Sequence, residues 1–413
     1  MKGTFRSLGS FNYRLWAAGA IVSNVGTWMQ RIAQDWLVLT RLTDQNATAV
    51  GIVMALQFGP ALLLLPLTGY AADNFDRRKL LFATQAAMGL LALGLGLLTV
   101  SGAVRLSQVY VFAFLLGCAS AFDAPARQTF VSELVGEASL SNAVALNSAS
   151  FNTARLIGPA VAGMLIASVG SGWVFLINAV SYAAVLYSLY LLRVDELSKP
   201  DKPGSSSHGL IDGLRYVWRR KDLKTALLML FLIGTFGLNF PIFISTMAVK
   251  TYHSGAGRYG LLTSMMAIGS VMGALLTARR TAPRLEHLLA SAAAFGLACT
   301  LAAIAPSYLL FGLVLTAVGI SAQTFTTTTN SLVQLSTEPA MRGRVIAILL
   351  AILMGTTPLG APLVGWVADW AGPRWALGIA AVSGFAAAAV GYAYIRKRRL
   401  EPDEPDEEYE EHA

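Results

Sequence analysis

The chain has 413 residues, of which 55% are hydrophobic and only 13% are charged, whereas about a quarter of the residues are charged in a typical soluble protein. The charged residues cluster between long apolar runs, so the composition excludes an ordinary soluble enzyme and predicts an integral membrane protein. The net charge of +8 would suggest a nucleic-acid partner in a soluble chain, but the placement of the basic residues explains it differently, and we expect no nucleic acid.

Twelve membrane-spanning helices are predicted, because a bilayer core of about 30 Å takes roughly 20 helical residues to cross. The first helix is predicted over 15–39, and the fifth begins near Leu140. The other spans come from charge-free runs, which cover 45–72, 80–104, 106–122, 156–192, 225–249, 259–278, 287–337, 345–368 and 375–395. The runs 156–192 and 287–337 are long enough for two helices, with turns expected at Gly170 and near Ser307.

The basic residues predict the orientation of these spans. If the N-terminus is inside, only five of the 31 lysines and arginines face outside, namely Arg41, Arg105, Lys250, Arg258 and Arg374. Cytoplasmic loops carry the excess of Lys and Arg, so both termini are predicted to be cytoplasmic. The first apolar segment has the length of a span and lacks a cleavage site, so it does not read as a signal peptide.

The chain is predicted to consist of two six-helix halves, 1–192 and 225–395. Glycines recur between the halves at one constant offset, pairing Gly117 with Gly319, Gly158 with Gly360 and Gly163 with Gly365. Between the halves, 193–224 reads as a cytoplasmic linker that ends in an amphipathic helix on the inner leaflet. The tail, 396–413, is acidic and predicted to be disordered. Two parallel halves with a site between them are typical of secondary transporters.

A short charged loop lies between the second and third predicted helices, where 69–79 read G-Y-A-A-D-N-F-D-R-R-K. The loop resembles the signature loop of the major facilitator superfamily at Gly69, Asp73, Arg77, Arg78 and Lys79. It departs from that pattern at Asp76, where the family usually has glycine, and this departure resembles the branch of enterobactin-type and drug exporters. The resemblance covers the whole chain and implies an all-α, twelve-helix transporter of a bacterial cytoplasmic membrane.

The resemblance also implies a conformational latch at this loop. Asp73 would contact the N-terminus of the eleventh helix near 342–344, where the helix dipole favours an anion. Arg77 would pair with an acid at the inner end of the fourth helix, and Asp123 is our candidate. The equivalent loop of the second half, 278–281, lacks the acid, so the latch is predicted to hold the halves on the inside only.

The predicted fifth helix resembles a glycine- and proline-rich motif of exporters in the same superfamily. The matching positions are Ala145, Ala154, Gly158, Pro159 and Gly163, with alanine in place of some of the family's glycines. Small residues let helices approach closely, and proline bends a helix. The resemblance implies an antiporter that exports its substrate.

Charged side chains within spans indicate functional sites, because they are costly to bury. Arg31 and Asp35 lie four residues apart on the first helix and share a face, which we expect to line the central cavity. Asp35 is our candidate proton carrier, with Arg31 tuning its pKa; a permanent structural ion pair is the alternative. Arg155 on the fifth helix could attract an anionic or catecholate-like substrate, or it could pair with another helix.

Further polar and aromatic side chains are candidates for the cavity wall or for hydrogen bonds between helices. They are Asn24, Trp28, Gln34, Gln57, Asn152, Asn239 and Gln323. No Gly-Lys pair of a phosphate-binding loop is present, and the four histidines offer no zinc constellation. We therefore expect no cofactor, no metal site and no enzymatic activity.

These features predict a monomeric, proton-coupled exporter of siderophore-like or amphipathic drug-like small molecules, which works by alternating access in the lipid bilayer. An importer of a small metabolite, a nickel-type metal exporter of the same branch and a membrane protein that does not transport are the alternatives. The histidine-rich tail expected of a nickel exporter is missing, because His412 stands alone in the tail.

Overall fold

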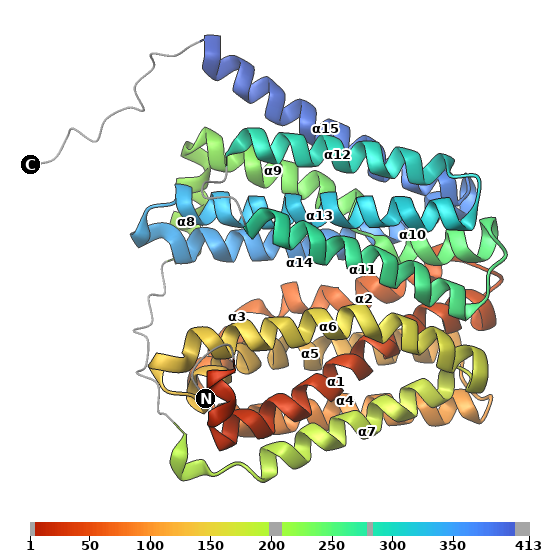
Figure 1. The fold of residues 1–413 in the computed structure, drawn as a ribbon, viewed down its shortest axis with the longest axis vertical. Coiled ribbons are helices and arrows are strands. Elements are labelled where there is room, and N and C mark those ends of the chain that lie inside the picture. Colours follow the sequence, from red (N-terminus) through yellow and green to blue (C-terminus); the bar gives the residue numbers. More distant parts are fainter. Residues whose placement is uncertain (1–4, 198–208, 279–283, 401–413) are drawn as a thin grey trace, which may run out of the picture.

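The structure, a computed structural model, describes residues 5–197, 209–278 and 284–400, and these ranges form helices without β-strands (Figure 1). The first bundle, drawn from red to yellow-green, contains α1 (Phe11–Leu37), α2 (Ala47–Leu63), α3 (Leu65–Asn74), α4 (Arg77–Val100), α5 (Leu106–Leu134), α6 (Glu137–Val169) and α7 (Ser171–Tyr190). The second bundle, drawn from green to blue, contains α9 (Lys221–Phe236), α10 (Phe240–Thr246), α11 (Ala256–Ala278), α12 (Leu285–Ile304), α13 (Tyr308–Ser336), α14 (Pro339–Trp370) and α15 (Pro373–Leu400). The short α8 (Gly209–Arg219) precedes the second bundle and packs against α14.

Ten segments of the described ranges are long and apolar enough to cross a membrane. α1 and α2 are not among them, since α1 carries many polar side chains and α2 has only 17 residues. We expected one span over 45–72, but the structure divides this run into α2 and α3 around Leu64. The proline at position 66 has no N–H to donate to the Leu62 carbonyl, so one backbone hydrogen bond across the break cannot form.

The two turns predicted within the double-length runs are confirmed. Gly170 separates α6 from α7 with a φ of +91°, a conformation that glycine adopts without steric cost. Ser307 opens α13, where its hydroxyl oxygen accepts a hydrogen bond from the Leu310 N–H at 3.4 Å. This contact is an N-cap, which satisfies one of the free N–H groups at the start of a helix.

The backbones of the two bundles touch at one end of the molecule. We call it the far end: it carries the connection between α1 and α2 and lies opposite the N-terminus (Figure 1). A Cβ on Gly365 of α14 would lie 2.5 Å from the Ala47 carbonyl oxygen of α2, and one on Gly163 of α6 would lie 2.7 Å from the Ala256 carbonyl oxygen of α11. Only glycine permits such an approach. Because Gly163 and Gly365 occupy equivalent positions in the predicted repeat, each bundle makes the same contact with the other.

A carboxylate joins the bundles at the same end. Asp369, near the end of α14, accepts hydrogen bonds from the N–H groups of Ala47 and Thr48, each at 2.8 Å, and from the Thr48 hydroxyl at 2.7 Å. Lys250 Nζ lies 2.8 Å from the same carboxylate. An anion at a helix N-terminus satisfies free N–H groups and interacts favourably with the helix dipole. Asp369 of the second bundle therefore caps α2 of the first.

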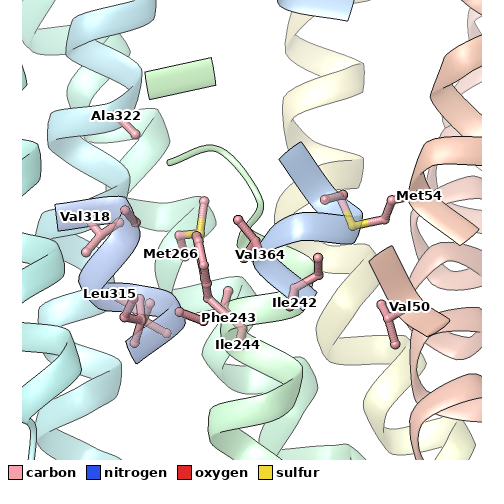
Figure 2. Close-up of a cluster of buried hydrophobic side chains, with 14 of the residues drawn as sticks. Val50, Met54, Ile242, Phe243, Ile244, Met266, Leu315, Val318, Ala322 and Val364 are labelled. Atoms are coloured by element: carbon pink, nitrogen blue, oxygen red, sulfur yellow. The ribbon is translucent and has the colours of Figure 1, made fainter. Parts of the chain in front are cut away.

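An apolar core continues from the far end into the molecule. Figure 2 shows Val50 and Met54 of α2 in one buried cluster with Ile242 of α10 and Val364 of α14. The cluster removes apolar surface of both bundles from contact with their surroundings. The bundles are thus held together by side-chain packing as well as by the glycine contacts and Asp369.

Replacing Asp369 with asparagine should open the far end. The amide keeps the shape of the side chain but loses the negative charge that interacts with Lys250 and with the N-terminus of α2. Hydrogen bonds to a charged group contribute about 1.5–3 kcal/mol, so the ratio of closed to open molecules should fall by about tenfold or more. Distances between spin labels at Arg105 and Arg258, one exposed position on each bundle, would measure this in a cysteine-free background.

The matched control is Asp44→Asn, which removes an exposed carboxylate of the same end and should leave the label distances unchanged. A distance distribution of Asp369→Asn that matches the parent protein would contradict the role given to this carboxylate.

Candidate functional site

A cavity of about 210 Å³ lies between the two bundles. Its walls come from α1, α2 and α6 of the first bundle and from α10, α11 and α14 of the second. Arg31, Asp35 and Arg155 are its charged lining residues, and all three belong to the first bundle. The second bundle contributes uncharged side chains, among them Phe240 and Tyr259. A cavity that both halves line is the usual place for a substrate site in an architecture of this kind.

The polar face of α1 forms one wall of the cavity, as the sequence predicted. Trp28, Arg31 and Asp35 follow one another at steps of three and four residues, which places them on one side of the helix. Asp35 is only 6% exposed, and the fully buried Tyr259 of α11 donates a hydrogen bond to its Oδ2 at 3.4 Å. This distance is long for a hydroxyl and a carboxylate. It nevertheless connects the candidate proton carrier of the first bundle to the second bundle.

The alternative for Arg31 and Asp35, a permanent structural ion pair, is wrong for this conformation. Among the described ion pairs with N–O distances up to 4.0 Å, none joins these two side chains. The Arg31 guanidinium instead lies over two rings, 4.8 Å from the centroid of Trp28 and 5.4 Å from that of Phe58. Spacing by four residues brings two side chains to one face, but the aromatic rings compete with the carboxylate for the cation.

Arg155 approaches the same indole ring from α6. Its Cζ lies 5.8 Å from the centroid of Trp28. Pairing with an acid of another helix was one alternative for this residue, and no described side chain forms an ion pair with it. The cavity therefore holds two guanidinium groups on one aromatic residue.

The backbone beside the cavity is not helical throughout. We expected one continuous helix over 225–249, but α9 ends at Phe236 and α10 begins at Phe240. Leu238, which lies in the break, lines the cavity together with Pro241. Non-helical backbone at membrane depth is tolerated where it lines a cavity, and interrupted helices are frequent at transporter binding sites.

Five predicted lining residues lie away from the cavity wall, and four of them bond to nearby groups of their own bundle. The Asn24 amide donates to the Ser150 hydroxyl at 3.4 Å, the Asn152 amide to the Ser148 carbonyl at 2.9 Å, and the Gln323 amide to the Thr327 hydroxyl at 3.1 Å. The Asn239 amide donates to the Thr235 carbonyl at 2.7 Å, and both Asn239 and Gln34 are buried in the helical packing. Trp28, Gln57 and Arg155 line the cavity as predicted.

Two aromatic residues of the site were missed by the sequence analysis. Phe58 contacts the Arg31 guanidinium from α2, and Tyr259 contacts Asp35 from α11. Trp36 also stacks on Tyr259, with ring centroids 6.0 Å apart. Aromatic residues near the ends of spans are common interface anchors, so nothing in the sequence marks Tyr259 as the partner of a buried acid.

The charged loop before α4 has a different partner from the one predicted. Arg77 Nη1 lies 2.6 Å from the Glu133 carboxylate, near the end of α5. Asp123 lies ten residues earlier, about 15 Å along a helix at about 1.5 Å per residue, and its carboxylate accepts hydrogen bonds from Thr84, Gln85 and Arg127. The predicted contact between Arg77 and Asp123 is therefore wrong, and Glu133 occupies that role.

Two other residues of this loop form hydrogen bonds at the ends of helices. Asp76, which stands where the family usually has glycine, caps α4 by accepting from the Lys79 N–H at 2.9 Å. The Arg78 guanidinium donates to the carbonyls of Leu189 and Tyr190, at 2.8 and 3.2 Å, at the end of α7. A cation is favoured there by the helix dipole.

The latch itself remains a prediction. Among the described residues, no atom beyond Gly69's own stretch of helix lies within 4 Å of where a Cβ on Gly69 would stand. The side chain of Asp73 and the loop residues 279–283 lie outside the described residues. α3, which carries both Gly69 and Asp73, packs against α5 of its own bundle.

The motif of the fifth span lies on α6, between the two bundles. A Cβ on Gly158 would lie 2.7 Å from Trp28 Cβ on α1, and the Pro159 carbonyl faces Gly260 on α11. Gly163 makes the far-end contact with α11, and Ala154 is fully buried. The predicted close approach of helices is confirmed at these positions, whereas Ala145 is exposed. α6 thus packs against the cavity helix of its own bundle and against the other bundle.

A double-mutant cycle would test the corrected partner of Arg77. Arg77→Ala and Glu133→Gln should show a coupling free energy of about 0.5–3 kcal/mol, which is typical of residues in contact. Arg77→Ala and Asp123→Asn should be additive, because Asp123 belongs to the separate network with Arg127. Thermal unfolding of the purified protein measures both cycles. Additivity of Arg77 with Glu133, or strong coupling of Arg77 with Asp123, would contradict the assignment.

The chain is similar to several membrane transporters of known function. It is 28% identical to the staphyloferrin A transporter of Staphylococcus aureus, over 92% of this chain and 95% of the relative. It is 27% identical to the multidrug efflux pump Tap of Mycolicibacterium fortuitum, over 86% and 88% of the two chains. The enterobactin exporter EntS of Shigella flexneri is 24% identical, over 86% and 84%.

Solved structures show the same fold. A bacterial homologue of the lysosomal transporter Spinster superposes with a TM-score of 0.73 at 14% identity, covering 97% of this chain and 99% of the other. A D-xylose–proton symporter superposes with a TM-score of 0.70 at 14% identity, covering 94% and 98%. The family profile described as transmembrane secretion effector matches residues 4–412. With its two helical bundles around a shared cavity, the chain belongs to this transmembrane secretion effector family of the major facilitator superfamily.

Proposed function

We propose that the protein is a proton-coupled exporter of amphipathic small molecules in a bacterial cytoplasmic membrane, working by alternating access as a monomer. The observation that carries the proposal is the cavity between the bundles, which combines a buried carboxylate with aromatic walls from both halves. The exporting relatives, a multidrug pump and an enterobactin exporter, support the direction. Their cargoes suggest siderophore-like or drug-like molecules for this chain.

The proposed topology has twelve spans and cytoplasmic termini. Ten of these are the candidate spans described above. The eleventh is α1, and the twelfth consists of the short α2 and its continuation, α3. With cytoplasmic termini the far end faces outward, so the contacts of Gly163, Gly365 and Asp369 close the cavity to the outside. The halves would be 1–192 and 225–395, joined by the linker 193–224 with α8. Of the predicted tail 396–413, residues 396–400 continue α15, and 401–413 lie outside the described residues.

Asp35 is the proposed coupling residue because it is the acid in the cavity wall and contacts the other bundle through Tyr259. The ionised carboxylate is the stronger acceptor for the Tyr259 hydroxyl. Asp35 would take up a proton from the outside when the far end is open and carry it as the bundles close. Release of the proton to the inside would leave the ionised carboxylate to accept from Tyr259, which holds the far end closed while the cavity takes up cargo. The change between inward-open and outward-open states is therefore proposed to depend on Asp35 and Tyr259. Arg31 takes no part in this contact, since its guanidinium lies over the rings of Trp28 and Phe58.

Asp35→Asn should abolish efflux driven by a pH gradient, because the amide does not exchange a proton in the relevant range. Exchange of labelled cargo for unlabelled cargo at equal pH should persist, because the cavity keeps its shape. Everted vesicles energised with acid inside measure the first activity, and counterflow without a gradient measures the second.

Asp195→Asn, an exposed acid outside the cavity, is the matched control and should transport like the parent protein. Full proton-driven efflux by Asp35→Asn would refute the coupling role. Faster accumulation of cargo in right-side-out vesicles than in everted vesicles would favour the alternative, an importer.

A further inference from the structure

We propose that the cargo of the cavity is an anion with an aromatic body, bound by the guanidinium groups of Arg31 and Arg155 beside Trp28. This inference rests on the proposed function, because it names the class of solute that the exporter carries. It narrows the range of drug-like molecules to acids such as carboxylates and phenolates.

The two arginines are brought together by the packing of α6 on α1. A Cβ on Gly158 would lie 2.7 Å from Trp28 Cβ, so the helices are in close contact one turn away from Arg155. As a result both guanidinium groups lie near one indole, at 4.8 Å for Arg31 and 5.8 Å for Arg155. The indole face stabilises the cations but supplies no hydrogen-bond acceptor in the plane of the guanidinium.

The charges of the cavity do not balance. Among its described lining residues are two guanidinium groups and one carboxylate, that of Asp35, whose described hydrogen bond comes from Tyr259. Arg31 Nε is buried without a hydrogen-bond partner among the described residues. A buried cation without acceptors is costly, so an incoming anion would supply the missing acceptors. The guanidinium fork matches the geometry of a carboxylate.

The remaining walls indicate the rest of the molecule. Phe58 faces the Arg31 guanidinium, and the second bundle contributes Phe240, Tyr259 and Met266. Apolar and aromatic walls with a few polar groups at one side suit an amphipathic ligand whose polar group is held in place. A lipophilic cation would fill the same space but would meet two like charges, so the cavity should exclude it.

Calorimetric titration of the purified, detergent-solubilised protein with 2-naphthoate, 2-naphthamide and (2-naphthyl)trimethylammonium tests the proposal. These probes share one ring system and differ in charge. The parent protein should bind the anion at least tenfold more tightly than the neutral amide, and the cation more weakly still. Equal affinity for the three probes, or preference for the cation, would overturn the proposal.

Arg155→Gln should lower the affinity for 2-naphthoate by tenfold or more and leave that for 2-naphthamide nearly unchanged. Arg155→Lys keeps the charge and should restore part of the loss, which a merely structural role would not predict. Arg105→Gln removes an exposed arginine of the far end and should bind all probes like the parent. A uniform loss of affinity for anion and amide in Arg155→Gln would contradict anion recognition by this residue.

Transport of the same probes in everted vesicles separates this inference from the proposed function. Movement of the amide or the cation without movement of 2-naphthoate would refute the anion site but keep the exporter. Binding of 2-naphthoate that depends on Arg155, with none of the three probes moved, would keep the anion site and contradict the proposed export.

Discussion

Direct contact between helix backbones of the two bundles is the constraint on which the rest of the molecule depends. Gly163 and Gly365 allow α6 to lie against α11 and α14 to lie against α2, and no larger residue would fit there without moving a helix. This approach brings Tyr259 within reach of Asp35 and gives the cavity walls from both halves. It also brings the α2 N-terminus to Asp369, so the capping depends on the same geometry.

The chemistry of the cavity is divided unequally between the bundles. The first bundle supplies Arg31, Asp35 and Arg155, and the second supplies aromatic and apolar surface. If the bundles move apart as proposed, the charged groups stay together on the first bundle, and the apolar wall of the second bundle separates from them. The interrupted backbone between α9 and α10 lies on that apolar wall, where small changes in its conformation would alter the fit without disturbing the charged groups.

Features that depend on local chemistry were predictable from the sequence. The turns at Gly170 and near Ser307 and the cavity-facing side of α1 follow from the preferences of turn residues and from helical spacing. Partners across helices were not. The choice between Asp123 and Glu133 for Arg77 depends on the depth of each acid in α5, and apolar helices carry no marker of depth or rotation. The approach of Phe58 from α2 to Arg31 likewise appears only in the folded chain.

The unequal number of cationic and anionic groups in the cavity has an electrical consequence. While Asp35 carries the proton, the empty site has two net positive charges among its described lining residues, whereas an ionised Asp35 together with a bound monoanion makes the site neutral. A membrane potential that is negative inside then acts mainly on the empty carrier, since a full elementary charge changes the free energy by about 2.3 kcal/mol per 100 mV. The field would draw the unloaded cavity toward the cytoplasm, returning the protein to the state in which it collects its next cargo, while the loaded, neutral form would move outward unopposed.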